Sequence, residues 1–435
     1  MPEKYIVNPS SNINGTISVP GDKSISHRSL ILLSISEGIG KISGLLESED
    51  CLATLNIFKK MGIEIIKDKK NSYTINGKGL NGLKKPMENL NCGNSGTSMR
   101  LLAGLLSAQN FSSCLIGDES LTKRPMQRIS LPLLKMGADI RLSKNKTAPI
   151  NINPSKKISS IEYNMPIDSA QIKSSIILAS IYASSESKII ENVKTRNHTE
   201  NIINYLNGRI ENFNNEIIVY PNIKLTAKDI DVPGDISSAM YIIVGCIISK
   251  KSEVIIKNVG LNELRIGGIE ILRLMGAKIE IKNVKSFGLE RVGDIYVCSS
   301  KLTGISIPDK YIASAIDEFP ILFIAAASAS GKTIIRNARE LKYKESDRLS
   351  VMSEGLIRCK INNILYEDGI EIDGGKVCGG IIDSHGDHRI AMSFSIAGII
   401  SKEPIIILNT ENISTSFPNF YRLVKDMGLN IEREF

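Results

Sequence analysis

A short phrase that occurs twice offers the first candidate for chemistry. The first copy, VPGDKSISHR, spans residues 19–28, and the second, VPGDISSAM, spans residues 232–240. An apolar run follows each copy, so the shared residues predict a Pro-Gly turn that enters a helix. Lys23 and Arg28 occur in the first copy alone, and cations oppose the helix dipole at this end. A bound anion would remove the conflict, so the first copy predicts an anion site.

Two further phrases in the first half combine small residues with cations. Residues 91–100, NCGNSGTSMR, precede an apolar run, and their glycines would let the backbone approach an anion beside Arg100. Residues 121–128, LTKRPMQR, add cations just before another helix. A tight strand-to-helix turn explains the first phrase equally well, and a solvated surface explains the second. Both interpretations stay open for each phrase.

Two polar helix starts follow in the first half. In residues 168–175, DSAQIKSS, Ser169 is a plausible helix cap and Gln171 offers a donor and an acceptor to a sugar-like ligand. The phrase TRNHTE at residues 195–200 contains capping residues of its own, which leave Arg196 without a structural explanation. A binding role and a surface role for Arg196 both stay open.

The second half places acids beside cations at three helix starts. These are DEFP at residues 317–320, KESDR at residues 344–348 and HGDHR at residues 385–389. A structural interpretation makes Asp317, Asp347 and Asp387 caps that satisfy backbone N–H groups. It leaves four charged or titratable residues unexplained: Glu345, Arg348, His388 and Arg389. Because arginine suits bidentate recognition of carboxylate or phosphate, these phrases predict a second anion-binding region.

Two other patterns suggest chemistry that the rest of the sequence does not support. Residues 326–333, AASASGKT, resemble a phosphate-binding loop, but Ala326 stands where the first glycine belongs and an apolar helix precedes it. We interpret this segment as a helix-to-strand turn. His385 and His388 are three residues apart, yet no third ligand pattern accompanies them among four histidines. We therefore expect no metal and no cofactor.

Composition narrows the class of protein. The chain has 435 residues and a net charge of +8, with 54 basic and 46 acidic residues mixed along it, and it has no Trp. Nucleic-acid binders usually concentrate their cations and interleave aromatics, so small anionic substrates suit this excess better. No apolar run is long enough to span a bilayer, and the N-terminal residues do not resemble a targeting signal. We expect a cytoplasmic protein that binds neither nucleic acid nor membranes.

The seven cysteines do not point to chemistry. They are scattered between Cys51 and Cys378 with no C-x-x-C pair, which argues against disulfides and a thiolate zinc site. We interpret them as small buried apolar residues.

The elements that must position these phrases form a repeat. An apolar helix that closes on Met-Gly and leads into a β-branched segment ends at Gly62, Gly137, Gly276 and Gly428. A weaker copy ends near Gly208, and a worn copy lies near Gly355. Six copies with short strands predict six α/β units.

The repeats also predict a domain organisation. Because the opening phrase recurs after about three units, we expect two similar domains of three units each. The first spans residues 21–235, and the second combines residues 1–20 with residues 236–435. The first strand, within residues 5–19, then belongs to the second domain, and the chain crosses between domains twice. Such crossings suit a hinge motion.

Taken in order, the charged phrases resemble the 5-enolpyruvylshikimate-3-phosphate synthase family of enolpyruvyl transferases. The matching phrases are PGDKSISHR at residues 20–28, GNSGT at 93–97, KESDR at 344–348 and DHRIAM at 387–392, and the resemblance covers essentially the whole chain. It implies two inside-out α/β barrel domains with three repeated folding units each. It also implies transfer of the enolpyruvyl group of phosphoenolpyruvate to the 5-hydroxyl of shikimate 3-phosphate, with release of phosphate, on the route to chorismate and the aromatic amino acids.

Carried over residue by residue, the resemblance assigns the substrates to named positions. It places shikimate 3-phosphate against Lys23, Ser24, Arg28, Ser169, Gln171, Arg196, Asp317 and Lys344. It places phosphoenolpyruvate against Lys23, Gly96, Arg124, Gln171, Arg348 and Arg389. The predicted catalytic residues are Glu345 as acid and base at the methyl carbon, Asp317 at the hydroxyl, and Lys23, while His388 would orient Glu345.

The chain departs from the family at one predicted contact. Many members place a Lys two residues before the Phe-Pro of the C-terminal phrase, and this chain has Thr415 there. The nearest alternative is the related enolpyruvyl transferase that acts on UDP-N-acetylglucosamine, which expects Lys-Asn where this chain has Lys23-Ser24 and a loop Cys that the chain does not obviously supply. A non-catalytic anion-binding protein is the second alternative. We expect a monomer.

Overall fold

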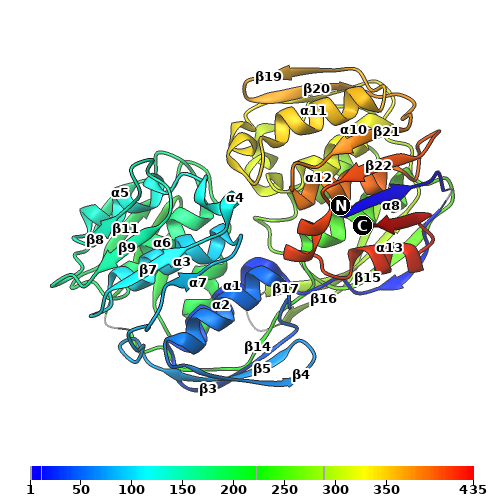
Figure 1. Ribbon diagram of the computed structural model, residues 1–435. Helices are drawn as coiled ribbons and strands as arrows, with labels where there is room; N and C mark the ends of the chain where they lie inside the picture. Colours follow the sequence, from blue (N-terminus) through cyan, green and yellow to red (C-terminus); the bar gives the residue numbers. More distant parts are fainter. Residues whose placement is uncertain (1, 11, 222, 288–289) are drawn as a thin grey trace. The chain divides into compact units, whose positions relative to one another are not determined.

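The computed structural model describes residues 2–10, 12–221, 223–287 and 290–435 (Figure 1). The chain divides into two compact units. The N-terminal unit comprises Gly21–Val232, and the C-terminal unit comprises Pro233–Phe435 together with the residues up to Pro20. Among the described residues, no helix has the length and apolar character needed to cross a membrane.

The N-terminal unit alternates helices with short strands. Its helices are α1 (Lys23–Ser34), α2 (Glu49–Lys60), α3 (Gly96–Ser107), α4 (Glu119–Thr122), α5 (Gln127–Lys135), α6 (Ala170–Ser180) and α7 (His198–Tyr205). Its strands are β3 (Glu37–Ser43), β4 (Glu64–Lys69), β5 (Ser72–Lys78), β6 (Leu90–Asn91), β7 (Ser113–Ile116), β8 (Asp139–Arg141), β9 (Ile150–Asn153), β10 (Glu162–Asn164), β11 (Ser187–Ile190), β12 (Ile210–Phe213), β13 (Glu216–Val219) and β14 (Ile230–Asp231).

The C-terminal unit repeats this alternation. Its helices are α8 (Ile236–Ile248), α9 (Gly267–Leu274), α10 (Phe319–Ser328), α11 (Arg348–Arg358), α12 (His388–Ala397) and α13 (Phe420–Asp426), with short 3-10 turns η1 (Asp309–Tyr311), η2 (Ala313–Ala315), η3 (Arg339–Tyr343) and η4 (Glu411–Thr415). Its strands are β1 (Lys4–Val7), β2 (Gly15–Ile17), β15 (Glu253–Gly260), β16 (Lys278–Phe287), β17 (Glu290–Cys298), β18 (Lys332–Ile335), β19 (Asn363–Tyr366), β20 (Gly369–Asp373), β21 (Gly380–Asp383), β22 (Ile405–Leu408) and β23 (Ile431–Glu434).

The described strands form six small sheets that share one pattern. In the sheet β6-β7-β9-β8, for example, β6 pairs with β7 in parallel, and the remaining pairings are antiparallel. The sheet β18-β20-β19 has three strands. In place of the fourth strand of the other sheets, isolated parallel bridges pair Thr303 with Ser330 and Ser306 with Ile334 of β18. The predicted α/β class with repeated units is therefore confirmed.

The helices of each unit fall into two kinds. In the C-terminal unit, α8, α10 and α12 pack on one another, and nearly all of their residues are buried. A helix that is apolar on all sides must lie inside a core, so these three helices form the centre of that unit. In the N-terminal unit α1, α3 and α6 are similarly buried, while α2, α5 and α7 keep a polar face.

The predicted helix ends are right at four positions and wrong at two. Gly62, Gly137, Gly276 and Gly428 all have positive φ directly after the Met that ends their helix. In the weaker copy, however, Asn207 adopts the positive φ one residue before Gly208, since asparagine tolerates this conformation.

The worn copy near Gly355 is the second wrong position. Gly355 lies inside α11, which continues to Arg358, and the positive φ belongs to Lys360. Gly355 instead permits close packing, because a Cβ there would lie 2.3 Å from the ring of Phe394.

The two copies of the VPGD phrase lie where the chain passes between the units, and strands are exchanged there. By its place in the repeat, β2 precedes α1, but it pairs in parallel with β15 of the C-terminal unit. Conversely, β14 precedes α8 but pairs with β3 of the N-terminal unit. Asp22 caps α1 by accepting the backbone N–H of Ile25 at 2.9 Å, and Asp235 caps α8 by accepting the backbone N–H of Ser237 at 3.0 Å. The shared aspartates are therefore helix caps.

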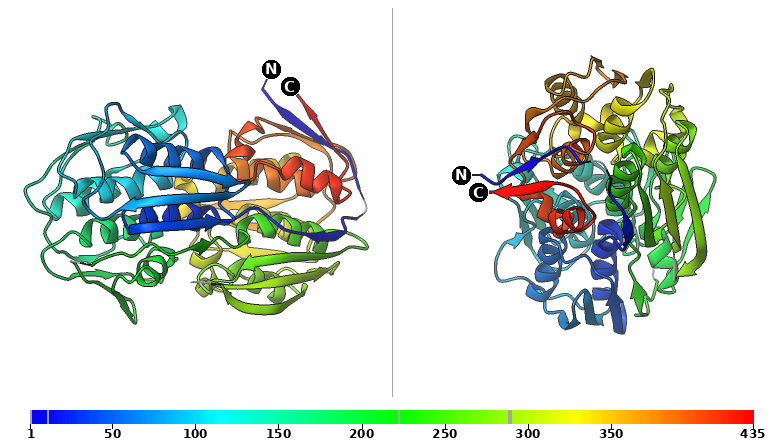
Figure 2. Two further views of the ribbon diagram at one scale, coloured as in Figure 1. Left: turned by 90° about the horizontal axis from the view of Figure 1, so that it is seen from below. Right: turned by 90° about the vertical axis from the view of Figure 1, so that its right-hand side faces the viewer.

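The ends of the chain meet in one sheet of the C-terminal unit. Its order is β21-β22-β1-β23, and β1 pairs antiparallel with both neighbours, so that Lys4 lies opposite Leu408 and Glu434 (Figure 2).

The cysteines are less uniform than predicted. Four are buried, but Cys298 is exposed, and Cys114 and Cys378 are partly exposed, so the expectation of burial is wrong for these three. Burial raises the pKa of the Cys51 thiol to about 12, as expected for an inert packing residue.

Candidate active site

The start of α1 carries the two cations of the first VPGD copy. Lys23 forms an ion pair with Asp50 of α2. The Arg28 guanidinium is buried, and it donates to Thr199 Oγ1 at 2.7 Å, to Ser174 Oγ at 2.8 Å and to the Ser24 carbonyl at 3.0 Å. Arg28 thus ties the starts of α1, α6 and α7 together.

The start of α3 brings a glycine against two guanidinium groups. A Cβ at Gly96 would lie 3.3 Å from Arg124 Nη1 and 3.4 Å from Arg100 Nη1. Arg124 donates to Asn94 Oδ1 at 2.6 Å and to Ser120 Oγ at 3.3 Å. Backbone N–H groups at the helix start and two cations therefore surround Gly96, which is the arrangement of an anion site.

Gln171 of α6 contacts Arg100 of α3. Its Oε1 accepts from Arg100 Nη1, and its Nε2 donates to Thr97 Oγ1 at 2.9 Å. Arg100 was noted within the Gly-rich phrase but not assigned to a substrate, because a sequence does not show which arginines near a glycine turn toward it. Ser169 occupies the N-cap position of α6 without making a side-chain cap bond, and Arg196 is partly exposed in the loop before α7.

The N-terminal unit also contains a buried ionic cluster that the sequence did not reveal. The Lys173 side chain, 1% exposed, lies 3.1 Å from Glu191 Oε2 and 2.8 Å from Glu200 Oε1, and it donates to the Thr195 carbonyl at 3.0 Å. Burial raises the pKa of Glu191 despite the neighbouring Lys173. The cluster joins α6, the end of β11 and α7, so it fixes the loop that carries Arg196.

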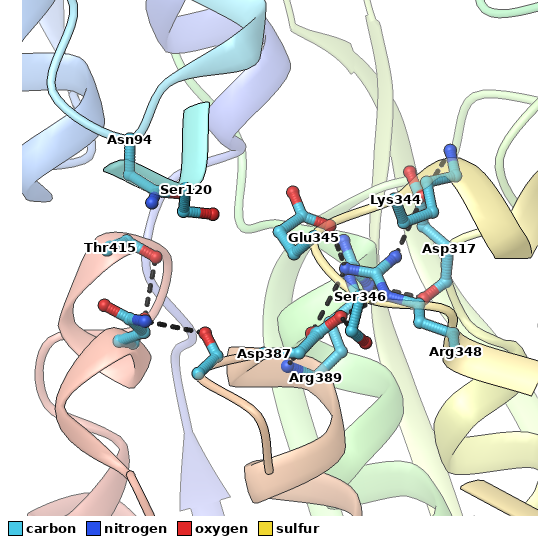
Figure 3. A network of polar contacts seen from close by, with 12 residues as sticks. Asn94, Ser120, Asp317, Lys344, Glu345, Ser346, Arg348, Asp387, Arg389 and Thr415 are labelled. Atoms are coloured by element: carbon cyan, nitrogen blue, oxygen red, sulfur yellow. Dashed lines mark hydrogen bonds and ion pairs between the residues drawn. The ribbon is translucent and has the colours of Figure 1, made fainter. Parts of the chain in front are cut away.

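The C-terminal unit contains a second set of charged residues, centred on Arg348 (Figure 3). Arg348 Nε lies 2.8 Å from Asp387 Oδ2, and Nη2 pairs with Glu345. Ser346 Oγ also donates to Asp387 at 3.0 Å. The buried guanidinium therefore pairs closely with Asp387, which is buried, and with Glu345, which is partly exposed.

Asp317 does not cap a helix, contrary to one structural interpretation of the sequence. Residue 318 occupies the N-cap position of α10 and makes no side-chain cap bond. Instead, Asp317 Oδ1 lies 3.2 Å from Lys344 Nζ and 3.7 Å from Arg348 Nη1, and its carbonyl accepts from Arg389 Nη1 at 2.7 Å. Asp347 and Asp387 do cap α11 and α12.

Electrostatics keep Arg348 and Asp387 ionised. Burial opposes the charge of Arg348, but Asp387 and Glu345 outweigh it and raise the pKa of the guanidinium. Burial also acts to raise the pKa of Asp387, but Arg348 outweighs it and lowers this pKa below its usual value. Because arginine is always protonated in proteins, Arg348 presents a fixed positive charge at the centre of this set.

Two other predicted features can be located in the fold. Thr415, which stands where many family members have a lysine, is buried at the end of η4. Its hydroxyl donates to the Asn412 carbonyl at 2.7 Å. The segment that resembles a phosphate-binding loop is a turn between α10 and β18, as predicted. Among the described residues, no group of three or more His, Cys, Asp or Glu side chains is placed to hold a metal ion.

The predicted residues divide into two sets, one in each unit. The N-terminal set contains Lys23, Ser24, Arg28, Gly96, Arg124, Ser169, Gln171 and Arg196. The C-terminal set contains Asp317, Lys344, Glu345, Arg348, His388 and Arg389. The role of His388 in orienting Glu345 stays a prediction.

Comparisons with known proteins identify the family. The sequence profile described as EPSP synthase (3-phosphoshikimate 1-carboxyvinyltransferase) matches residues 7–423. A protein of Hydrogenovibrio crunogenus named 3-phosphoshikimate 1-carboxyvinyltransferase is 46% identical, with 98% of each chain covered. A protein of the same name from Legionella pneumophila (strain Lens) is 47% identical, with 98% of this chain and 99% of that protein covered.

A solved structure gives the same answer. EPSP synthase from Acinetobacter baumannii is 44% identical, with a TM-score of 0.90 and complete coverage of both chains. The fold and the charged sets therefore define a two-domain α/β transferase. The chain belongs to the EPSP synthase family.

Proposed function

We propose that this chain transfers the enolpyruvyl group of phosphoenolpyruvate to the 5-hydroxyl of shikimate 3-phosphate and releases phosphate. Relatives that are 46% and 47% identical over nearly the whole chain carry the corresponding name. The substrates are small anions, which fits the net charge of +8 and the arginines at the helix starts.

The observation that carries the proposal is the placement of Glu345 on Arg348. Arg348 already has a buried carboxylate partner in Asp387, so the pair with Glu345 is not needed to neutralise it. A protein that only binds anions gains nothing from a second carboxylate at its arginine. Because Glu345 is partly exposed and Arg348 fixes its position, its carboxylate can be placed against a substrate for proton transfer.

The reaction has two balanced steps. In the first, a proton adds to the methylene carbon of phosphoenolpyruvate while the 5-oxygen, losing its own proton, bonds to the adjacent carbon. In the second, the resulting tetrahedral intermediate loses a methyl proton, and phosphate leaves with the electron pair of its C–O bond. Glu345 would give and later take the proton at the methyl carbon, and Asp317 would take the hydroxyl proton.

The cations would bind the substrates and stabilise developing charge. Arg28, Arg196, Ser24, Ser169, Gln171 and Lys344 are assigned to shikimate 3-phosphate, and Asp317 to its hydroxyl. Gly96, Arg124, Arg348 and Arg389 are assigned to phosphoenolpyruvate, and Gln171 also to this substrate. Lys23 is assigned to both substrates and to catalysis. Because charge builds up on the leaving phosphate, fixed cations there lower the barrier.

Phosphate release decides between this function and its nearest alternative. The protein is incubated with phosphoenolpyruvate and either shikimate 3-phosphate or UDP-N-acetylglucosamine, and inorganic phosphate is measured. We expect phosphate release when phosphoenolpyruvate is combined with shikimate 3-phosphate, and none when it is combined with the UDP-sugar. Release with the UDP-sugar instead would overturn the assignment, and binding of both anions without release would indicate the non-catalytic alternative.

A loss of function at Lys23 should separate catalysis from folding. We expect Lys23→Met to abolish turnover while the circular dichroism spectrum and thermal midpoint stay near those of the parent. Near-normal turnover would remove Lys23 from the catalytic group. We further propose that the protein acts as a cytoplasmic monomer, and light scattering at the 47.6 kDa of one chain would support the monomer.

A further inference from the structure

The second copy of the VPGD phrase also has a charged environment, although its own residues are neutral after Asp235. Ser237 follows Asp235 by two residues, as Ser24 follows Asp22 in the first copy. Ser237 Oγ donates to Glu318 Oε1, and it accepts from Arg265 Nη2 at 2.7 Å. Arg265 reaches this helix start from the loop before α9, and its Nη2 also lies 3.4 Å from Asp235 Oδ1.

Glu318 lies between two arginines. Its Oε1 is 3.9 Å from Arg265 Nη2 and 3.8 Å from Arg389 Nη1. The side chain is 1% exposed, and its Oε2 has no hydrogen-bond partner among the described residues. Burial of a carboxylate with an unsatisfied oxygen is costly, so the position demands an explanation.

A purely local role does not explain Glu318. It occupies the N-cap position of α10 but does not cap that helix. The nearby charges that attract it belong to Arg265 and Arg389.

We propose that Glu318 is a positioning residue for Arg389. The Glu318 carboxylate lies at the start of α8. It takes the place there that a substrate anion is proposed to take at the start of α1. Together with the Asp317 carbonyl, which accepts from the same Nη1 at 2.7 Å, Glu318 fixes the Arg389 guanidinium. Arg265 and Ser237 in turn hold Glu318.

The proposal deepens the proposed function, because it assumes that Arg389 binds phosphoenolpyruvate. Loss of the carboxylate would leave Arg389 with one fewer fixed partner and would remove the anion that Arg389 shares with the buried Arg265. The affinity for phosphoenolpyruvate should fall, while binding of shikimate 3-phosphate should change little. A small carboxylate from solution should partly replace the missing side chain.

The test compares Glu318→Gln, Glu318→Ala and the exposed control Glu280→Gln. We expect both Glu318 variants to raise KM for phosphoenolpyruvate about tenfold or more, which is the loss expected for a charge-assisted contact. The dissociation constant of shikimate 3-phosphate, measured by calorimetry without phosphoenolpyruvate, should stay within about twofold of the parent. Glu280→Gln should change neither value.

Acetate provides a readout that does not depend on turnover. Added acetate should raise the thermal midpoint of Glu318→Ala by more than it raises that of the parent protein, since a ligand that binds only the folded state stabilises that state. It should also lower the raised KM of that variant. The proposal would be overturned if Glu318→Gln left the KM for phosphoenolpyruvate unchanged or lowered it. It would also be overturned if acetate raised the thermal midpoint of Glu318→Ala no more than it raised that of the parent. If the parent protein itself released no phosphate, the proposed function would fail, and the acetate result would still test the anion position.

Discussion

Arg348 and Asp387 form a buried ion pair in which Nε of the arginine lies 2.8 Å from Oδ2 of the aspartate, and neither side chain is more than 1% exposed. Asp387 also accepts the backbone N–H of Arg389 at 2.9 Å and so caps α12. One carboxylate thus orients an arginine of the candidate site and starts the helix that carries another.

The Asp387→Asn variant separates these two tasks. Asparagine caps helices about as well as aspartate, so the cap should survive while the charge is lost. Removing one partner of a buried ion pair costs about 3–5 kcal/mol, and we expect a loss of this size in urea unfolding. The control is Asp347→Asn, because Asp347 caps α11, and it should change stability little. Equal losses in the two variants would contradict the importance of the pair.

Glu345 should matter for the rate rather than for the fold. Glu345→Gln keeps the size of the side chain and leaves Arg348 paired with Asp387, so the thermal midpoint should change little. Loss of general acid and base catalysis should lower kcat about 10²- to 10⁴-fold. Exchange of solvent deuterium into the methylene carbon of phosphoenolpyruvate, followed by NMR, should fall in parallel. Normal exchange would assign the proton transfer to another group, and Glu354→Gln on the exposed face of α11 is the control.

Two glycines of α3 should respond differently to alanine. At Gly96 the new methyl group would meet the guanidinium ends of Arg124 and Arg100, which are flexible, so Gly96→Ala should fold normally and raise KM for phosphoenolpyruvate. At Gly104 the methyl group would lie 2.0 Å from the Ser175 carbonyl oxygen of α6. Backbone cannot move aside cheaply, so Gly104→Ala should lower the thermal midpoint. An unchanged KM in Gly96→Ala would show that phosphoenolpyruvate does not contact this helix start.

Lys173→Met should be strongly destabilising. It would leave Glu191 and Glu200 buried without their cation, and breaking such a pair costs about 3–5 kcal/mol. Lys188→Met is the matched control, because Lys188 pairs with Glu216 at 2.7 Å on the surface and should affect urea unfolding far less. Adding Glu191→Gln to Lys173→Met should recover part of the loss. A small effect of Lys173→Met would mean that water reaches the cluster.

His27 should make stability depend on pH. Burial first, and then Lys23 and Arg28, hold the pKa of His27 well below its usual 6.5, so the unfolded chain binds a proton more readily than the folded one. The contribution is therefore fully present above pH 6.5 and is lost as the pH falls, by up to about 1.4 kcal/mol per unit. His27→Gln should remove this slope between pH 6.5 and 5, whereas His385→Gln, at an exposed site, should not. An unchanged slope in His27→Gln would assign it to other groups.

The sequence was most informative where a local rule decides the structure. Met-Gly predicted four helix ends correctly, because glycine is the default residue at positive φ. The rule failed at two helix ends, where Asn207 and Lys360 take the positive φ in place of a glycine. Local rules also predicted that Asp347 and Asp387 are caps.

Contacts between site residues that are distant in sequence could not be predicted from local rules. One structural interpretation made Asp317 a helix cap, but its side chain lies beside Lys344 and Arg348, which follow it by about 30 residues in sequence. Arg265 reaches Ser237 and Glu318 from a loop that carries no motif. Charge pairing across the fold is set by tertiary packing, and residue spacing does not encode it.

The position of β1 between β22 and β23 has a consequence for folding during synthesis. Residues 21–232 contain every partner that their own sheets need, so this unit can fold while the rest of the chain is still being made. The strand Lys4–Val7 leaves the ribosome before the N-terminal unit, but its partners are Ile405–Leu408 and Ile431–Glu434. Until these are made, both edges of β1 lack their pairing strands, and unpaired edges invite aggregation. A strand that is made before a whole folding unit is therefore protected only after it.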